Sequence, residues 1–179
     1  RAVEAMKAGA LDFLTKPVSE IALIARVRSL VRLKMMTDEL RMRAVTSKEI
    51  GIQLTGIDAI ADAGRQGRIL VVDDRPASYD RITGMLASEH TIEVETNPNR
   101  ALLRCSDANY DLLIVSLAIE NFDALRLCSQ VRSLDRTRNV PVLAITDSKD
   151  NARMARGLEI GINDYLMRPI DKNELLARV

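Results

Sequence analysis

The sequence of 179 residues predicts an α/β fold in which a parallel five-stranded sheet is covered by helices. The first observation behind this prediction is that short apolar runs alternate with helical patterns from residue 68 onward. Such runs are typical of strands buried on both faces, as in parallel sheets. The second observation is an internal repeat: residues 1–27 resemble residues 153–179 without a gap, so that each residue matches one 152 positions later.

The repeat divides the chain into parts. Both copies follow one plan: a helix, a glycine, a short apolar strand, a basic residue, a proline and a second helix. The matched pairs include Gly9 with Gly161, Asp12 with Asp164, and Pro17 with Pro169. A spacing of 152 residues corresponds to one domain and a linker. We therefore assign residues 1–44 to the end of a first domain, 45–67 to a linker and 68–179 to a second domain with a truncated last helix, and we interpret the chain as a piece of a longer protein.

Residues 19–44 are predicted to form one long helix, because Ser19 is a suitable N-cap and neither Pro nor Gly interrupts this stretch. Its apolar residues fall three to four positions apart, namely Ile24, Val27, Val31 and Met35. The charged residues 32–43 form either a solvated helix end or a connecting or dimerising helix. A helix–strand–helix fragment alone leaves apolar faces and strand edges uncovered. We therefore expect the first-copy fragment to pack on the second domain or to exchange into another chain.

The second domain is predicted to contain five strand–helix units. The predicted strands are residues 68–72, 91–95, 111–115, 140–145 and 164–167. The predicted helices are residues 76–88, 98–106, 123–134 and 150–160, and a last helix begins at residue 172. Five units in this order fit a flavodoxin-like, doubly wound fold. In such folds the carboxyl ends of the strands form the functional edge of the sheet.

Polar residues follow the predicted strands at this edge. Asp73 and Asp74 come directly after the first strand, and adjacent carboxylates suit a hard cation such as Mg²⁺. Alternatively, one of the two caps the next helix and the other is solvated. The third strand ends at Ser116, the fourth at Thr146 and the fifth at Arg168. Together these positions are a more specific signal than the aspartate pair alone.

The motifs ILVVDD, DLLIVS, VPVLAIT and DYLMRP, with DFLTKP in the earlier copy, resemble the receiver domain of bacterial two-component response regulators. The resemblance implies a phosphoacceptor aspartate after the third strand and Mg²⁺ held by that aspartate and two further acids. It also implies a Thr or Ser and a Lys that contact the phosphoryl group. Ser116 stands at the phosphoacceptor position and Arg168 at the lysine position, whereas Thr146 is retained and Tyr165 occupies the aromatic switch position.

These departures predict a pseudo-receiver that is not an enzyme. Phosphotransfer requires an ionised carboxylate nucleophile and a metal, but a serine hydroxyl is not ionised near neutral pH and no base is visible beside Ser116. With one carboxylate lost, Mg²⁺ binding at Asp73 and Asp74 is expected to be weak or vestigial. Arg168 is expected to pair with one of these aspartates in the absence of phosphate. The alternative is a receiver that is phosphorylated on Ser116.

The first copy keeps the residues that the resemblance implies. Lys16 stands at the lysine position and Phe13 at the aromatic position. An intact first receiver is therefore expected to accept a phosphoryl group from a histidine kinase. The resemblance also implies cis peptide bonds at Lys16–Pro17 and Arg168–Pro169.

Two receivers in tandem, the second of them degenerate, are similar to the PleD group of response regulators. The likeness extends to the runs NFDALR and LEIGINDYLMRPID. It implies a GGDEF domain beyond this chain, acting as a diguanylate cyclase that makes cyclic di-GMP. It also implies that the second receiver is an adaptor in dimerisation, through a homodimer or receiver–receiver contacts. The alternative is another output domain: a kinase, a phosphodiesterase or a DNA-binding domain.

The composition argues against several other functions. A net charge of +1, 3% aromatic residues and no Trp argue against nucleic-acid binding. One histidine, His90, and two cysteines cannot supply a four-ligand zinc site. Cys105 and Cys128 are interpreted as small apolar residues in a reducing compartment. No apolar run is long enough to cross a bilayer and no secretory signal pattern is present, so we expect a cytoplasmic protein without membrane contacts.

Overall fold

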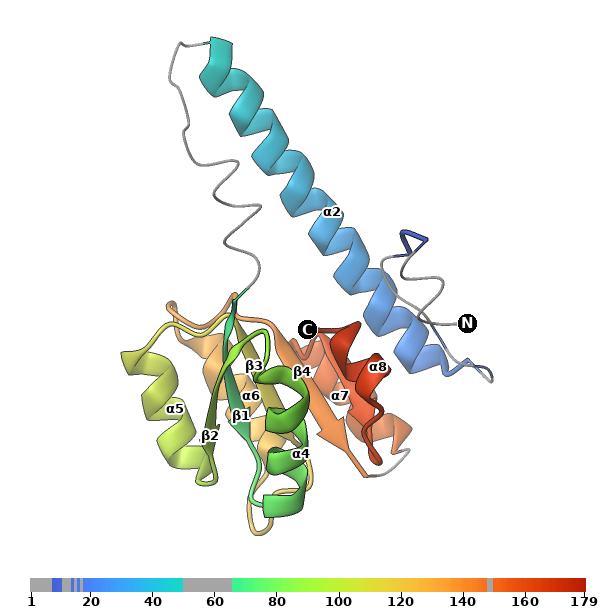
Figure 1. The fold of residues 1–179 in the computed structure, drawn as a ribbon, viewed down its shortest axis with the longest axis vertical. Coiled ribbons are helices and arrows are strands. Elements are labelled where there is room, and N and C mark those ends of the chain that lie inside the picture. Colours follow the sequence, from blue (N-terminus) through green and yellow to red (C-terminus); the bar gives the residue numbers. More distant parts are fainter. Residues whose placement is uncertain (1–7, 11–13, 15, 17, 50–65, 148–149) are drawn as a thin grey trace.

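A five-stranded parallel sheet with helices on both faces forms the body of the protein (Figure 1). The computed structural model describes residues 8–10, 14, 16, 18–49, 66–147 and 150–179. The strands are β1 (Arg68–Val72), β2 (Thr91–Glu95), β3 (Leu112–Ser116), β4 (Val142–Thr146) and β5 (Asp164–Met167), in the sheet order β2-β1-β3-β4-β5. Every neighbouring pair of these strands is parallel, which confirms the predicted flavodoxin-like sheet. We call residues 66–179 the sheet domain.

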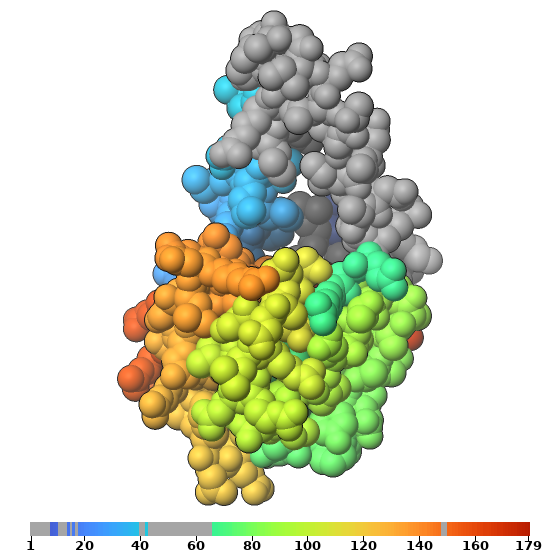
Figure 2. All heavy atoms as spheres, turned by 90° about the vertical axis from the view of Figure 1, so that its left-hand side faces the viewer, coloured from blue at the N-terminus to red at the C-terminus, as the bar shows by residue number. Residues whose placement is uncertain are grey.

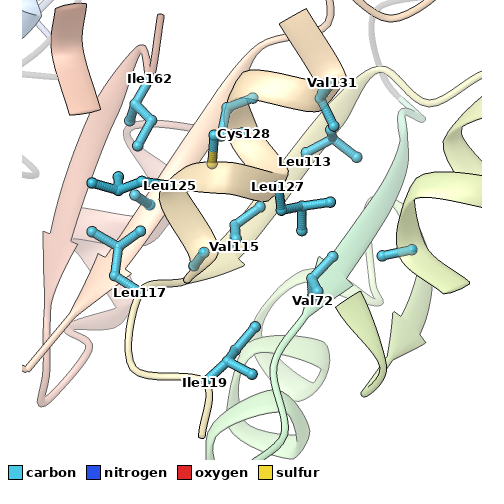
Figure 3. Packing of buried hydrophobic residues seen from close by; sticks show 14 of the residues in the cluster. Val72, Leu113, Val115, Leu117, Ile119, Leu125, Leu127, Cys128, Val131 and Ile162 are labelled. Atoms are coloured by element: carbon cyan, nitrogen blue, oxygen red, sulfur yellow. The ribbon is translucent and has the colours of Figure 1, made fainter. Parts of the chain in front are cut away.

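Helices of the sheet domain cover its two faces in unequal numbers. The helices are α4 (Pro76–Leu86), α5 (Pro98–Asp107), α6 (Ala124–Ser133), α7 (Asn151–Ile160) and α8 (Lys172–Leu176). On one face, α5, α6 and α7 enclose the larger hydrophobic cluster, and on the other α4 and α8 enclose the smaller one. Figure 3 shows Leu125, Cys128 and Val131 of α6 packed beside Leu113 and Val115 of β3. All five residues of β3 are buried because the strand is central and covered on both faces.

Side chains near the helix ends explain where several helices begin and end. Asn97, Asp123, Asp150 and Asp171 cap helices α5, α6, α7 and α8 by accepting hydrogen bonds from backbone N–H groups in the first turn. Helix α7 ends at Gly161, whose φ of 109° lies in the left-handed region that glycine adopts without strain. The fourth strand begins at Val142 rather than at residue 140 as predicted, because pairing with β3 begins at the Leu113–Val142 pair.

The first-copy fragment contributes a single long helix, α2 (Glu20–Glu49), which passes along β5 and α7. Ala25 of α2 is fully buried, and the Ser29 hydroxyl donates to the Asn163 carbonyl over 3.1 Å. The described part of the fragment therefore packs on the sheet domain, as expected. Leu33 and Met36 still line a cavity with Leu112 and Pro141, and the part of α2 after Met36 projects away from the sheet domain, as Figures 1 and 2 show.

Helix α2 is longer than predicted. The predicted helix end at residue 44 was wrong, because residues 45–49, which were assigned to the linker, are also helical. No glycine or proline lies between Pro17 and Gly51, so no helix-breaking residue stops the helix earlier. Within the described residues, no helix is both long enough and apolar enough to cross a bilayer.

Both cysteines are free and buried in the larger hydrophobic cluster. Burial raises the pKa of the Cys105 thiol to about 11. For Cys128, burial likewise raises the pKa, to about 12. Both thiols are therefore protonated near neutral pH and act as small apolar side chains.

Candidate functional site

The residues predicted at the strand ends do come together at the carboxyl edge of the sheet. Asp73 follows β1, Ser116 ends β3, and Arg168 follows β5. Because β3 lies between β1 and β4 in the sheet, Ser116 is at the centre of this edge. Thr146 ends β4 and is buried next to it in the sheet order. The peptide bond from Arg168 to Pro169 is cis, as the resemblance implied.

The Arg168 guanidinium binds several of the polar side chains at this edge. Its Nη2 lies 2.6 Å from Asp73 Oδ2 and donates to Ser116 Oγ over 3.1 Å and to Ser78 Oγ over 2.9 Å. Its Nη1 donates to Asp147 Oδ1 over 2.9 Å. Of the two partners predicted for Arg168, the structure selects Asp73, whose side chain is only 1% exposed. We call Asp73, Ser78, Ser116, Asp147 and Arg168 the arginine cluster.

Ser78 and Asp147 were not found by sequence reasoning. Ser78 lies in the first turn of α4, where a serine is ordinarily read as part of a helix start. Asp147 directly follows Thr146, and its charge next to a strand end is the signal that could have identified it. Burial alone would raise the pKa of Asp147, but hydrogen bonds from Arg168 and Arg75 outweigh it and lower this pKa. The Arg75–Asp147 ion pair spans 2.5 Å.

Asp74 has a different environment from Asp73. Its Oδ2 accepts a hydrogen bond from the Glu120 backbone N–H over 2.8 Å. Its Oδ1 is buried and has no hydrogen-bond partner among the described residues. Both oxygens of Asp73, in contrast, are engaged, since Oδ1 accepts from the Arg75 backbone N–H over 3.1 Å and Oδ2 from Arg168. The two adjacent aspartates thus do not act as a pair.

The residues at this edge do not fit Mg²⁺ as they stand. Mg²⁺ demands near-octahedral oxygen ligands, with carboxylates among them. Asp73 and Ser116 already bind the guanidinium of Arg168, which leaves Asp74 with one uncommitted carboxylate oxygen. In the part of the chain that the structure describes, no group of three His, Cys, Asp or Glu side chains is placed to hold a metal.

Ser116 is not arranged as an activated nucleophile. The residue is 1% exposed, and its Oγ accepts hydrogen bonds from the Ala118 backbone N–H and from Arg168. A serine nucleophile needs a neighbouring base that takes its proton. Both carboxylates of the arginine cluster, Asp73 and Asp147, are themselves bound by the guanidinium. Among the described residues, the contacts of the Ser116 hydroxyl are thus a backbone N–H and a cation, and neither of them is a base.

Tyr165 lies apart from the arginine cluster. Its hydroxyl is buried and donates to the Met154 carbonyl of α7 over 2.8 Å. Gly157 leaves the space for this ring, because a Cβ atom at that position would overlap the tyrosine hydroxyl. Lys16 of the first copy is exposed and lines a cavity between the start of α2 and the sheet domain. Phe13 and Pro17 lie outside the described residues.

The five-stranded parallel fold with polar residues at the carboxyl ends of its strands is that of a receiver domain, and the comparison with known families agrees. The response regulator receiver domain family matches residues 69–179, and the chain belongs to this family. The chain is 45% identical over 177 residues to the response regulator PleD of Caulobacter vibrioides. That match covers 99% of this chain but 38% of PleD, so the chain spans well under half of its relative.

Solved structures show the same fold. A response regulator from Chloroflexus aurantiacus has a TM-score of 0.60 and 27% identity, covering 63% of this chain and 93% of that one. The receiver domain of a Pseudomonas aeruginosa sensor histidine kinase has a TM-score of 0.57 and 25% identity, covering 62% of this chain and 92% of that one. The latter holds a magnesium ion in its active-site cleft.

Proposed function

We propose that the sheet domain is a pseudo-receiver that serves as an adaptor within a cytoplasmic PleD-type response regulator. The observation that carries the proposal is Ser116, a buried hydroxyl bound by Arg168 at the position of the phosphoacceptor. Without an ionised nucleophile the domain does not accept a phosphoryl group, and its role is to bind neighbouring domains.

The contact with α2 supports the adaptor role. Arg26 of α2 is buried and lies 3.8 Å from Asp164 and 3.6 Å from Glu174. Arg178, its equivalent 152 positions later, binds the same two carboxylates at 2.9 and 2.5 Å. Repeat-equivalent arginines of the two copies therefore converge on one acidic pair in the second copy. In this proposal the pair fixes the last helix of the preceding receiver on the adaptor.

The outward face of α2 supports the assignment of this helix to a first receiver. It exposes an apolar stripe of Leu23, Ile24, Val27, Val31 and Met35. Leu23 is 43% exposed, whereas its repeat equivalent Leu175 is fully buried under the sheet of the second copy. The sheet of a first receiver is the natural cover for Leu23. By likeness to PleD, that receiver takes its phosphoryl group from a histidine kinase and promotes dimerisation, and the output is a diguanylate cyclase.

A phosphorylation assay tests the central claim. The chain is incubated with acetyl phosphate and Mg²⁺, an active receiver serves as the positive control, and intact mass is measured. We expect no phosphorylated form. A stoichiometric phosphorylated form that disappears in Ser116→Ala would overturn the proposal. The output is tested separately by reading the parent sequence after Val179, where a GG[DE]EF motif is expected.

A further inference from the structure

We infer that the Arg168 guanidinium is a built-in cation that takes the place of Mg²⁺ in this pocket and excludes the metal. The inference rests on the proposed pseudo-receiver function and says what occupies the pocket of that pseudo-receiver. It explains why a member of a metal-binding family has a strand-end site whose residues do not fit the metal.

The contacts of Nη2 carry the inference. This single nitrogen faces oxygens of Asp73 after β1, Ser78 on α4 and Ser116 at the end of β3, at 2.6, 2.9 and 3.1 Å. Asp73 and Ser78 flank the start of α4, and Ser116 lies far from them in the sequence, yet all three oxygens face the same nitrogen. A cation at the same place would need the same oxygens, so the guanidinium and a metal ion compete for them. The side chain of Arg168 is 15% exposed, so the competition takes place in a largely desolvated pocket.

The contacts of Nη1 keep Nη2 in position. Nη1 donates to Asp147, which also receives Arg75 at 2.5 Å. Release of Arg168 would break its ion pairs with Asp73 and Asp147, and a metal ion at Asp73 would restore a counter-charge only there. A metal ion therefore has to displace an arginine that is held by two carboxylates and two hydroxyls.

A lysine could not hold the pocket in this way. Arg168 presents a planar fork of donors, whereas lysine carries one compact ammonium group. The ammonium cannot span Asp73 and Asp147 with the same donors that the two ends of the guanidinium supply. The earlier copy carries Lys16 at the equivalent position, so the repeat itself provides the conservative replacement.

The test is a metal titration of four forms of the chain: wild type, Ser116→Asp, Arg168→Lys, and the double variant. Mg²⁺ binding is measured by calorimetry, and Mn²⁺ is used as a paramagnetic probe of the Asp74 amide signal. If Arg168 excludes the metal, Ser116→Asp alone gains nothing, because the new carboxylate pairs with the arginine. The double variant is expected to bind at least about tenfold more tightly than wild type, since affinity follows the charge of the ligand set.

The controls separate this inference from the proposed function. Adding Asp74→Asn to the double variant should abolish the gain, and thermal unfolding monitors the fold of each form. Wild-type binding as tight as that of the double variant, with broadening at Asp74, would overturn the inference whether or not the variants fold. So would an equal gain from Ser116→Asp alone. Either result would leave the pseudo-receiver proposal standing, because only phosphorylation of Ser116 contradicts that.

Discussion

Replacing Gly157 with alanine places a methyl group where the Tyr165 hydroxyl already lies. The new Cβ would overlap that hydroxyl and would lie 3.2 Å from Tyr165 Cζ and 2.9 Å from Ile162 Cδ1. Tyr165 is 5% exposed and its hydroxyl is anchored to the Met154 carbonyl, so a ring that withdraws has to break this hydrogen bond. Either the ring leaves its pocket or α7 moves away from the sheet.

The expected loss of stability follows from three contributions. Overpacking of a core costs about 1–3 kcal/mol. Loss of the Tyr165–Met154 hydrogen bond costs about 1 kcal/mol. The change from glycine to alanine inside a helix returns about 1 kcal/mol. We therefore expect Gly157→Ala to lower the free energy of unfolding by about 1–3 kcal/mol.

Urea unfolding followed by circular dichroism measures this loss. Gly84→Ala is the matched control, because Gly84 lies within α4 and a Cβ there meets nothing within 4 Å. The control should stabilise the protein by about 0.5–1 kcal/mol. In a Tyr165→Phe background the overlapping hydroxyl is gone, so Gly157→Ala should cost at least about 1 kcal/mol less than in wild type. If Gly157→Ala stabilised the protein as much as the control does, the reasoning would be refuted.

Three further predictions concern charged groups. Arg26→Ala should lower the free energy of unfolding by about 1 kcal/mol and speed amide exchange in residues 20–32. Lys34→Ala is the control, because it removes only the exposed Lys34–Asp38 pair on the same helix, and it should change the free energy of unfolding by less than about 0.5 kcal/mol. Arg132→Met should cost about 2–3 kcal/mol in thermal unfolding, because Arg132 donates to the carbonyls of Gly161 and Val140 and to further oxygens that would lose their partner. The lowered pKa of Asp147 stabilises the fold above about pH 4, and this contribution is lost as pH falls through the folded-state value. Asp147→Asn should therefore flatten the stability profile below that pH, and an unchanged acid limb would contradict the assignment.

The strands were predictable because their short apolar runs fit a buried strand and no other element. A run such as DLLIV is too short for a buried helix and is followed by turn residues, so the sequence places β3 to within one residue. The end of α2 was less predictable. Residues 46–49 are polar and resemble a linker in composition, yet they continue a helix that no Gly or Pro interrupts.

The site was predictable as a set of positions but not as a set of contacts. Parallel strand ends must meet at one edge, which brings Asp73, Ser116 and Arg168 together from sequence order alone. The choice of Asp73 over Asp74 depends on the direction of each side chain, and only the folded structure shows it. Arg26 reaching Asp164 depends on how α2 crosses the sheet domain, which no local pattern encodes.

The end of α2 that projects from the sheet domain makes the helix a lever. It has 30 residues, and the part beyond the Ser29 contact extends about 30 Å at 1.5 Å per residue. A tilt of about 10° where α2 rests on the sheet domain would displace its far end by about 5 Å. Small changes in the seating of Ala25 and Arg26 are therefore magnified at Glu49, where the chain continues toward the next segment.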